Sequence, residues 1–86
     1  MKKIEAIHLL FIAKFVLSDM GMPQEAYEAE QAEIRLRGYF TAQNAREYAN
    51  YILPNGYKGH VILVLNRPEV ARAIAFIAAI LRSIED

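Results

Sequence analysis

The apolar positions of the C-terminal third predict a short buried segment followed by a long core helix. Val61 to Leu65 is an uninterrupted aliphatic run. Such a run is typical of a strand buried on both faces, although periodicity alone does not separate it from a buried helical turn. The chain then breaks, because Asn66 can cap a helix and Pro68 suits a first turn. The apolar face of the helix that follows consists of Val70, Ile74, Ile77, Leu81 and Ile84.

The opposite side of this C-terminal helix carries only a thin polar stripe. Arg72, Ala75 and Ala79 lie on it. In the plain interpretation the stripe is the solvent edge of a core helix. Short side chains also let two helix backbones approach closely, so these three positions are a candidate oligomer interface.

The N-terminal segment 2–18 is apolar nearly all the way round a helix. Its polar residues do not gather on one face, and a helix of this kind is buried on most sides. Gly21 and Pro23 then break the chain. The apolar residues form two lines, Ile4, Ile7, Phe11 and Phe15 in one and Leu9, Ile12 and Val16 in the other.

Residues 24–37 predict a second helix, with a strand as the competing interpretation. Pro23 stands at the start, glutamates occupy the first turns and arginines the last. Gly38 is placed as a left-handed terminator. However, apolar and polar residues alternate from Ile34 to Phe40, which predicts a strand at 33–40. We prefer the helix, because nothing breaks the chain between Ala32 and Ile34.

A third helix begins after Thr41, whose hydroxyl can cap it. It ends at the Pro54-Asn55-Gly56 turn. With the second helix it would form a helical hairpin over residues 24–53. Its apolar face consists of Ala42, Ala45, Tyr48, Ala49, Ile52 and Leu53.

Together these elements predict one domain, residues 1–86, that is mainly α. We expect a small bundle of about four helices with one short buried apolar segment or strand at 60–66. The alternative is an α+β fold in which strands at 33–40 and 60–66 are flanked by helices.

Composition adds the expectation of a partner. Hydrophobic residues make up 55% of the 86-residue chain, against about 45–50% in an average domain. A small chain also buries a smaller share of its surface than a large one. The surplus apolar surface is most simply covered by a second copy, so we expect a homo-oligomer and favour a dimer.

The apolar N-terminus resembles a secretory signal only superficially. Glu5, His8 and Lys14 interrupt it, and no small-residue cleavage site follows. It is also shorter than the roughly 20 apolar residues that span a bilayer. We therefore expect an uncleaved helix in a cytoplasmic protein rather than a membrane segment.

The reactive residue types are too sparse to predict catalysis. The chain has no cysteine, and its two histidines, His8 and His60, are far apart, so a metal site lacks ligands. No serine lies in a nucleophile elbow and no glycine-rich loop is built to hold phosphate. The glutamates of residues 25–33 would form a solvated helix face. We expect no enzymatic activity, no metal and no cofactor.

Tyrosines and basic residues gather in the middle of the chain. Tyrosine suits half-buried surfaces and is enriched in interfaces. Tyrosines can also lie at the border of a small hydrophobic core without any role in binding. From Arg35 to Arg72 basic residues outnumber acidic ones by six to two. On nucleic acid, arginine and lysine would meet phosphates while tyrosine stacks on unpaired bases. The candidate interaction surface is Tyr39, Tyr48, Tyr51 and Tyr57, and the candidate polyanion contacts are Arg35, Arg37, Arg46, Lys58 and Arg67.

Two functions follow from these patterns. The first is a small non-enzymatic protein that self-associates and works by binding another protein or an assembly. The alternative is a small nucleic-acid-binding regulator that uses the basic, tyrosine-containing middle segment.

Overall fold

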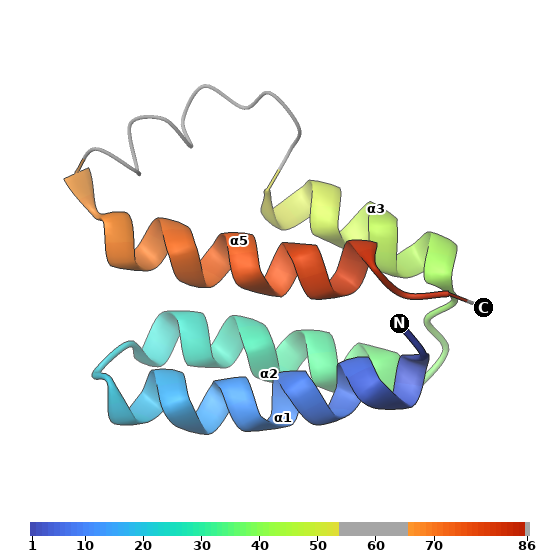
Figure 1. The fold of residues 1–86 in the computed structure, drawn as a ribbon, viewed down its shortest axis with the longest axis horizontal. Helices are drawn as coiled ribbons and strands as arrows, with labels where there is room; N and C mark the ends of the chain where they lie inside the picture. Colours follow the sequence, from blue (N-terminus) through green and yellow to red (C-terminus); the bar gives the residue numbers. More distant parts are fainter. Residues whose placement is uncertain (54–65, 86) are drawn as a thin grey trace.

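The computed structural model describes residues 1–53 and 66–85, which form a bundle of helices (Figure 1). The predicted mainly α bundle is confirmed. Residues 60–65, Tyr57 and Lys58 lie outside the described part, so the segment predicted at 60–66 is described only at Asn66. The helices are α1 (Lys3–Asp19), α2 (Pro23–Arg37), α3 (Ala42–Ile52) and α5 (Pro68–Arg82).

The four helices of the described chain are arranged as two packed pairs (Figure 1). α1 packs along α2 and α3 packs along α5, while α5 also contacts both α1 and α2. The prediction of a helical hairpin over residues 24–53 is therefore wrong. The reason lies in the buried side of α2, where Ala26, Ala29 and Ala32 present a smooth surface to the strongly apolar α1.

The strand alternative at 33–40 is wrong, because α2 continues to Arg37. Leu36, which fitted the alternation, is fully buried within the helix. The prediction of a left-handed Gly38 is also wrong, since its φ is −90°. Of the two glycines in the described part of the chain, Gly21 is the left-handed one, with a φ of 74° in the turn after α1, a conformation that residues with a Cβ rarely adopt.

The start of α3 confirms the predicted cap, and the start of α5 does not. Thr41 Oγ1 accepts from Asn44 N–H at 3.1 Å, and Asn44 Oδ1 accepts from Thr41 N–H at 3.2 Å. In α5 the cap position is held by Arg67 rather than Asn66. The cause is Pro68 at the first helical position, which keeps the residue before it out of the helical region.

The core is built mainly from alanine. Over residues 1–53 and 66–85, eleven of the buried positions are alanines, so neighbouring helices can approach closely along their length. A few large side chains fill the centre, namely Leu10, Leu36, Ile77 and Leu81.

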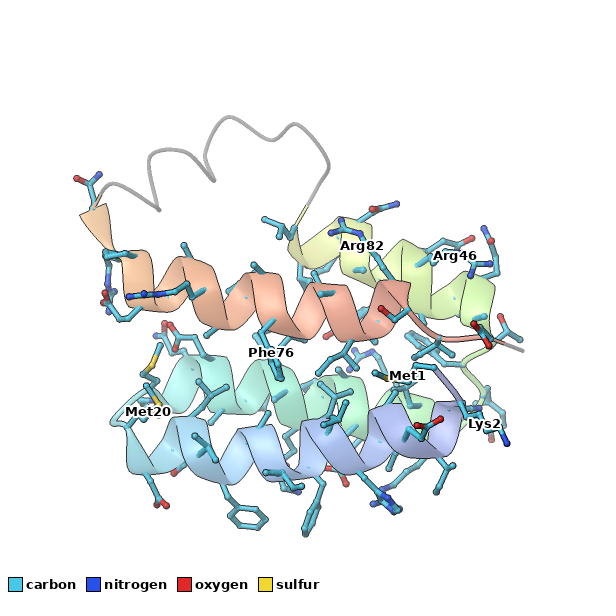
Figure 2. All side chains as sticks on the ribbon, viewed as in Figure 1. Met1, Lys2, Met20, Arg46, Phe76 and Arg82 are labelled. Atoms are coloured by element: carbon cyan, nitrogen blue, oxygen red, sulfur yellow. The ribbon has the colours of Figure 1, made fainter. Side chains whose placement is uncertain are left out.

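Polar contacts hold the ends of the bundle together. Arg82, in the last turn of α5, donates to Asn50 Oδ1 and to the Leu53 carbonyl, which ties α3 to α5 (Figure 2). The extended residues at the two ends of the chain run side by side, and Glu85 N–H donates to the Met1 carbonyl at 2.8 Å. These contacts place the start of α1 beside the end of α5.

Candidate interaction surface

The most unusual surface of the protein is the side of α1 that faces away from the bundle. α1 contacts α2 and α5 along its inner side, where Ala6, Leu10, Ala13 and Leu17 are buried. Its other side remains exposed, so the prediction that this helix is buried on most sides is wrong. We call the exposed side the α1 outer face and define it as Ile4, His8, Phe11, Ile12, Phe15, Val16 and Asp19.

The α1 outer face is apolar over most of its length. Ile12 is 58% exposed and Phe15 is 55% exposed. In a bundle helix this side normally carries charged and polar residues. Here six of the ten exposed residues of α1 are apolar, and the polar ones are Glu5, His8, Ser18 and Asp19.

The two phenylalanines of this face are held in place. Their rings meet edge to face, with centroids 5.1 Å apart. The Lys14 ammonium lies 4.7 Å from the centre of the Phe11 ring and 5.4 Å from that of Phe15. Both rings of this face therefore have favourable contacts within the chain itself.

A groove of about 440 Å³ borders the α1 outer face and is lined by residues of both α1 and α5. Phe76 of α5 projects toward the α1–α2 pair (Figure 2) and is 50% exposed. The polar residues Glu69 and Arg72 also line the groove. Its α1 wall consists of Leu9, Ile12, Ala13, Val16, Leu17 and Met20.

The predicted oligomer strip of α5 is only partly formed. Arg72 is exposed and lines the groove, and Ala79 is exposed as well, whereas Ala75 is half-buried. The residue that completes this side of α5 is Phe76, which was not among the predicted site residues. Its signal in the sequence is the spacing Arg72, Phe76, Ala79, Ser83, which repeats in steps of four and three.

A buried ionic cluster lies between α1 and α2. Glu33 is 5% exposed, although its acidic run was predicted to be solvated. Lys14 Nζ lies 3.0 Å from Glu33 Oε1, and Arg37 Nε donates to Glu33 Oε2 at 2.9 Å. Glu25 is buried too, so the acidic run turns two carboxylates inward, because α2 packs against both α1 and α5. Arg37 is thereby occupied by a carboxylate and is a poor polyanion contact.

The charge state of Glu33 depends on this cluster. Burial by itself would raise the pKa of the Glu33 carboxyl, but the ion pairs and hydrogen bonds from Lys14 and Arg37 outweigh burial. The net effect is a lowered pKa. Folding therefore favours the ionised form of the Glu33 carboxyl.

We predict that Glu33→Gln destabilises the fold by about 2 kcal/mol at neutral pH, because hydrogen bonds to charged groups are lost. The loss should shrink in acid. A lowered folded-state pKa stabilises fully above the unfolded value of about 4.3, and this contribution disappears as pH falls through the folded-state pKa. Urea unfolding of both proteins from pH 7 to pH 3 measures this. A difference that stays constant across the range would refute the role of Glu33.

The predicted tyrosine surface forms in part, on α3. The Tyr48 and Tyr51 rings stack with centroids 6.2 Å apart, and the Arg35 guanidinium lies 4.9 Å from the centre of the Tyr48 ring. Burial raises the pKa of the Tyr48 phenol, and the Glu28 carboxylate adds to the rise. The structure therefore brings Arg35, Tyr48 and Tyr51 together.

The other predicted residues do not join this group. Tyr39 is 97% exposed in the turn between α2 and α3. Arg46 donates to Gln43 at 3.3 Å, and Arg67 lies 3.7 Å from the Glu69 carboxylate. The basic residues of the middle segment thus do not converge into one continuous patch within the described chain.

The described part of the chain has neither a metal-binding cluster nor a membrane span. Over residues 1–53 and 66–85, no three His, Asp or Glu side chains lie close enough to share a metal ion. No helix in those ranges has the length and hydropathy needed to cross a bilayer.

Comparison with known proteins gives no relative. The chain matches no protein-family model, no curated protein and no solved structure. The function is therefore argued from the surfaces described above.

Proposed function

We propose that this chain is a non-enzymatic interaction protein that works by self-association, as a dimer in its simplest form. The observation that carries the proposal is the α1 outer face. Single exposed apolar side chains are ordinary, but a continuous apolar patch on a small protein is typical of a binding surface. The bordering groove with Phe76 extends the same surface onto α5.

The dimer would be the form that binds a further protein or an assembly. The α3 surface of Tyr48 and Tyr51 is suited to that second contact, because stacked tyrosines offer rigid apolar area with polar tips. We propose a cytoplasmic location on sequence grounds, since Glu5, His8 and Lys14 interrupt the apolar N-terminal run.

A retention experiment tests self-association. Tagged protein is immobilised, and an untagged copy of the same chain is passed over it at low and high salt. We expect retention at both salts, because apolar burial is not screened by ions. The tag alone is the control. Absence of retention at both salts would reject the proposal.

A second candidate function is nucleic-acid binding, which the group of Arg35, Tyr48 and Tyr51 favours. A guanidinium beside stacked tyrosine rings could contact a phosphate while the rings stack on an unpaired base. The experiment is retention on single-stranded DNA and RNA at increasing salt. Binding that falls steeply with salt supports this function, and no binding at low salt excludes it.

A further inference from the structure

We propose that the α1 outer face is covered by α1 of a second copy, packed antiparallel with His8 opposite Asp19 of the partner subunit. This inference rests on the proposed self-association and specifies its geometry. Three observations carry it: the exposed apolar area, the spacing of the residues along α1, and the positions of the charges.

The exposed area suits a dimer. Eight half-exposed apolar side chains line the α1 outer face and the groove. If each side chain has on the order of 150–200 Å² of surface, they present on the order of 700 Å². A stable interface takes about 800 Å² from each partner. These side chains are Ile4, Leu9, Phe11, Ile12, Phe15, Val16, Met20 and Phe76.

The spacing suits a helix as the occupant. Ile4, His8, Phe11 and Phe15 follow one another at steps of four, three and four residues. This is the repeat with which one helix packs along another over several turns. α1 lies at the edge of the bundle, on the side away from α3, so a second helix can approach it along its length (Figure 1).

The charges select an antiparallel arrangement. In a two-fold dimer with parallel α1 helices, each residue would face its own copy. Glu5 would then face Glu5 of the partner subunit, and Asp19 would face the partner's Asp19. Like charges placed directly opposite one another destabilise a helix pair. Antiparallel helices avoid both contacts.

The positions of the outer-face residues select the register. Full overlap of the two antiparallel α1 helices would place Ile12 opposite the partner's Leu10 and Phe15 opposite the partner's Ile7, and both of these residues are buried within their own subunit. A shift of five residues instead places His8 opposite the partner's Asp19, and the two-fold axis repeats this contact. The same register places Ile12 opposite the partner's Phe15 and Phe11 opposite the partner's Val16. Glu5 already accepts from Lys2 N–H at 3.0 Å within its own subunit.

Cysteine cross-linking tests the register. The chain has no cysteine of its own. In one subunit, residues 8 and 19 stand about 16 Å apart along the helix, whereas a disulfide needs Cα atoms within about 7 Å. Both positions are exposed, so the variants should fold. We expect the oxidised H8C/D19C double variant to run mainly as a covalent dimer on a non-reducing gel. H8C alone and D19C alone should remain mainly single chains.

Charge exchange gives a second, independent readout. His8→Glu places two like-charge pairs in the dimer and should raise its Kd about tenfold. Adding Asp19→Lys to the same chain places opposite charges at both contacts and should return the Kd to near its original value. Asp19→Lys without the first change is the matched control.

The outcomes separate this inference from the proposed function. A wild-type protein that is dimeric, but whose H8C/D19C variant cross-links no better than the single variants, would overturn the register and leave self-association standing. A wild-type protein that is monomeric would overturn both. A monomer that floats with anionic lipid vesicles would assign the α1 outer face to a membrane surface and would also overturn the inference.

Discussion

Ile12→Asp is expected to convert the protein from a dimer into a folded monomer. Ile12 is the most exposed apolar residue of the α1 outer face, and it also lines the groove. Burying one such side chain contributes about 1.5–3 kcal/mol, and a two-fold dimer contains two of them. The dimer Kd should therefore rise roughly a thousandfold. Sedimentation equilibrium measures the change directly.

The chain offers a matched control for this variant in Ile34→Asp. Ile34 is 50% exposed, but it lies on α2 outside the α1 outer face. We expect Ile34→Asp to leave the mass unchanged, and both variants to keep the helical circular-dichroism spectrum of the wild type. Equal dissociation by both substitutions would mean that the α1 outer face is not the interface.

Ile77→Ala is expected to have the largest effect on folding. Ile77 is fully buried in α5, the helix that contacts the other three described helices. Truncation of a buried isoleucine to alanine costs about 2–5 kcal/mol, which is a large part of the about 5–15 kcal/mol that stabilises a typical domain. The urea midpoint should fall sharply with little change in the slope of the transition.

The matched control for the core is Ile34→Ala, which removes the same atoms from a half-exposed position. It should cost less than about 1 kcal/mol, because little burial and no cavity are involved. Both proteins are measured at the same high concentration so that the dimer equilibrium is common to them. Similar losses for the two variants would contradict the central position of α5.

The helices themselves could be predicted from local pattern. Thr41 with Asn44 forms the cap that its sequence indicates, and strong helix formers in α2 outweigh the alternation that suggested a strand. The errors at the helix ends are local as well. Pro68 shifts the start of α5 by one residue, and Gly38 is not left-handed whereas Gly21 is.

The pairing of helices could not be predicted in the same way. α2 is next to α3 in sequence but packs on α1, because the pairing is decided by which apolar surfaces fit together. The pattern of apolar and polar residues along the chain also does not predict which side chains of two different helices form an ion pair. Glu33 is drawn into the interior by Lys14 of α1, a residue that sequence spacing does not connect with it.

The sequence indicated the candidate surface only indirectly, through its high content of apolar residues. A helix that is apolar all round predicts burial, and the prediction of burial within one chain is wrong for α1. The apolar pattern is explained if the α1 outer face is buried by a second copy of the chain. Phe76 is part of this surface, and its role emerges only when α1 and α5 lie side by side.

The solution mass of the intact chain tests the central claim most directly. Light scattering behind size exclusion is measured over a wide range of protein concentrations, at low and high salt. Self-association through an apolar face predicts twice the 9.8 kDa of a single chain at both salts, with dissociation only on dilution. A mass of 9.8 kDa at every concentration would contradict it and would leave the α1 outer face without a second copy to cover it.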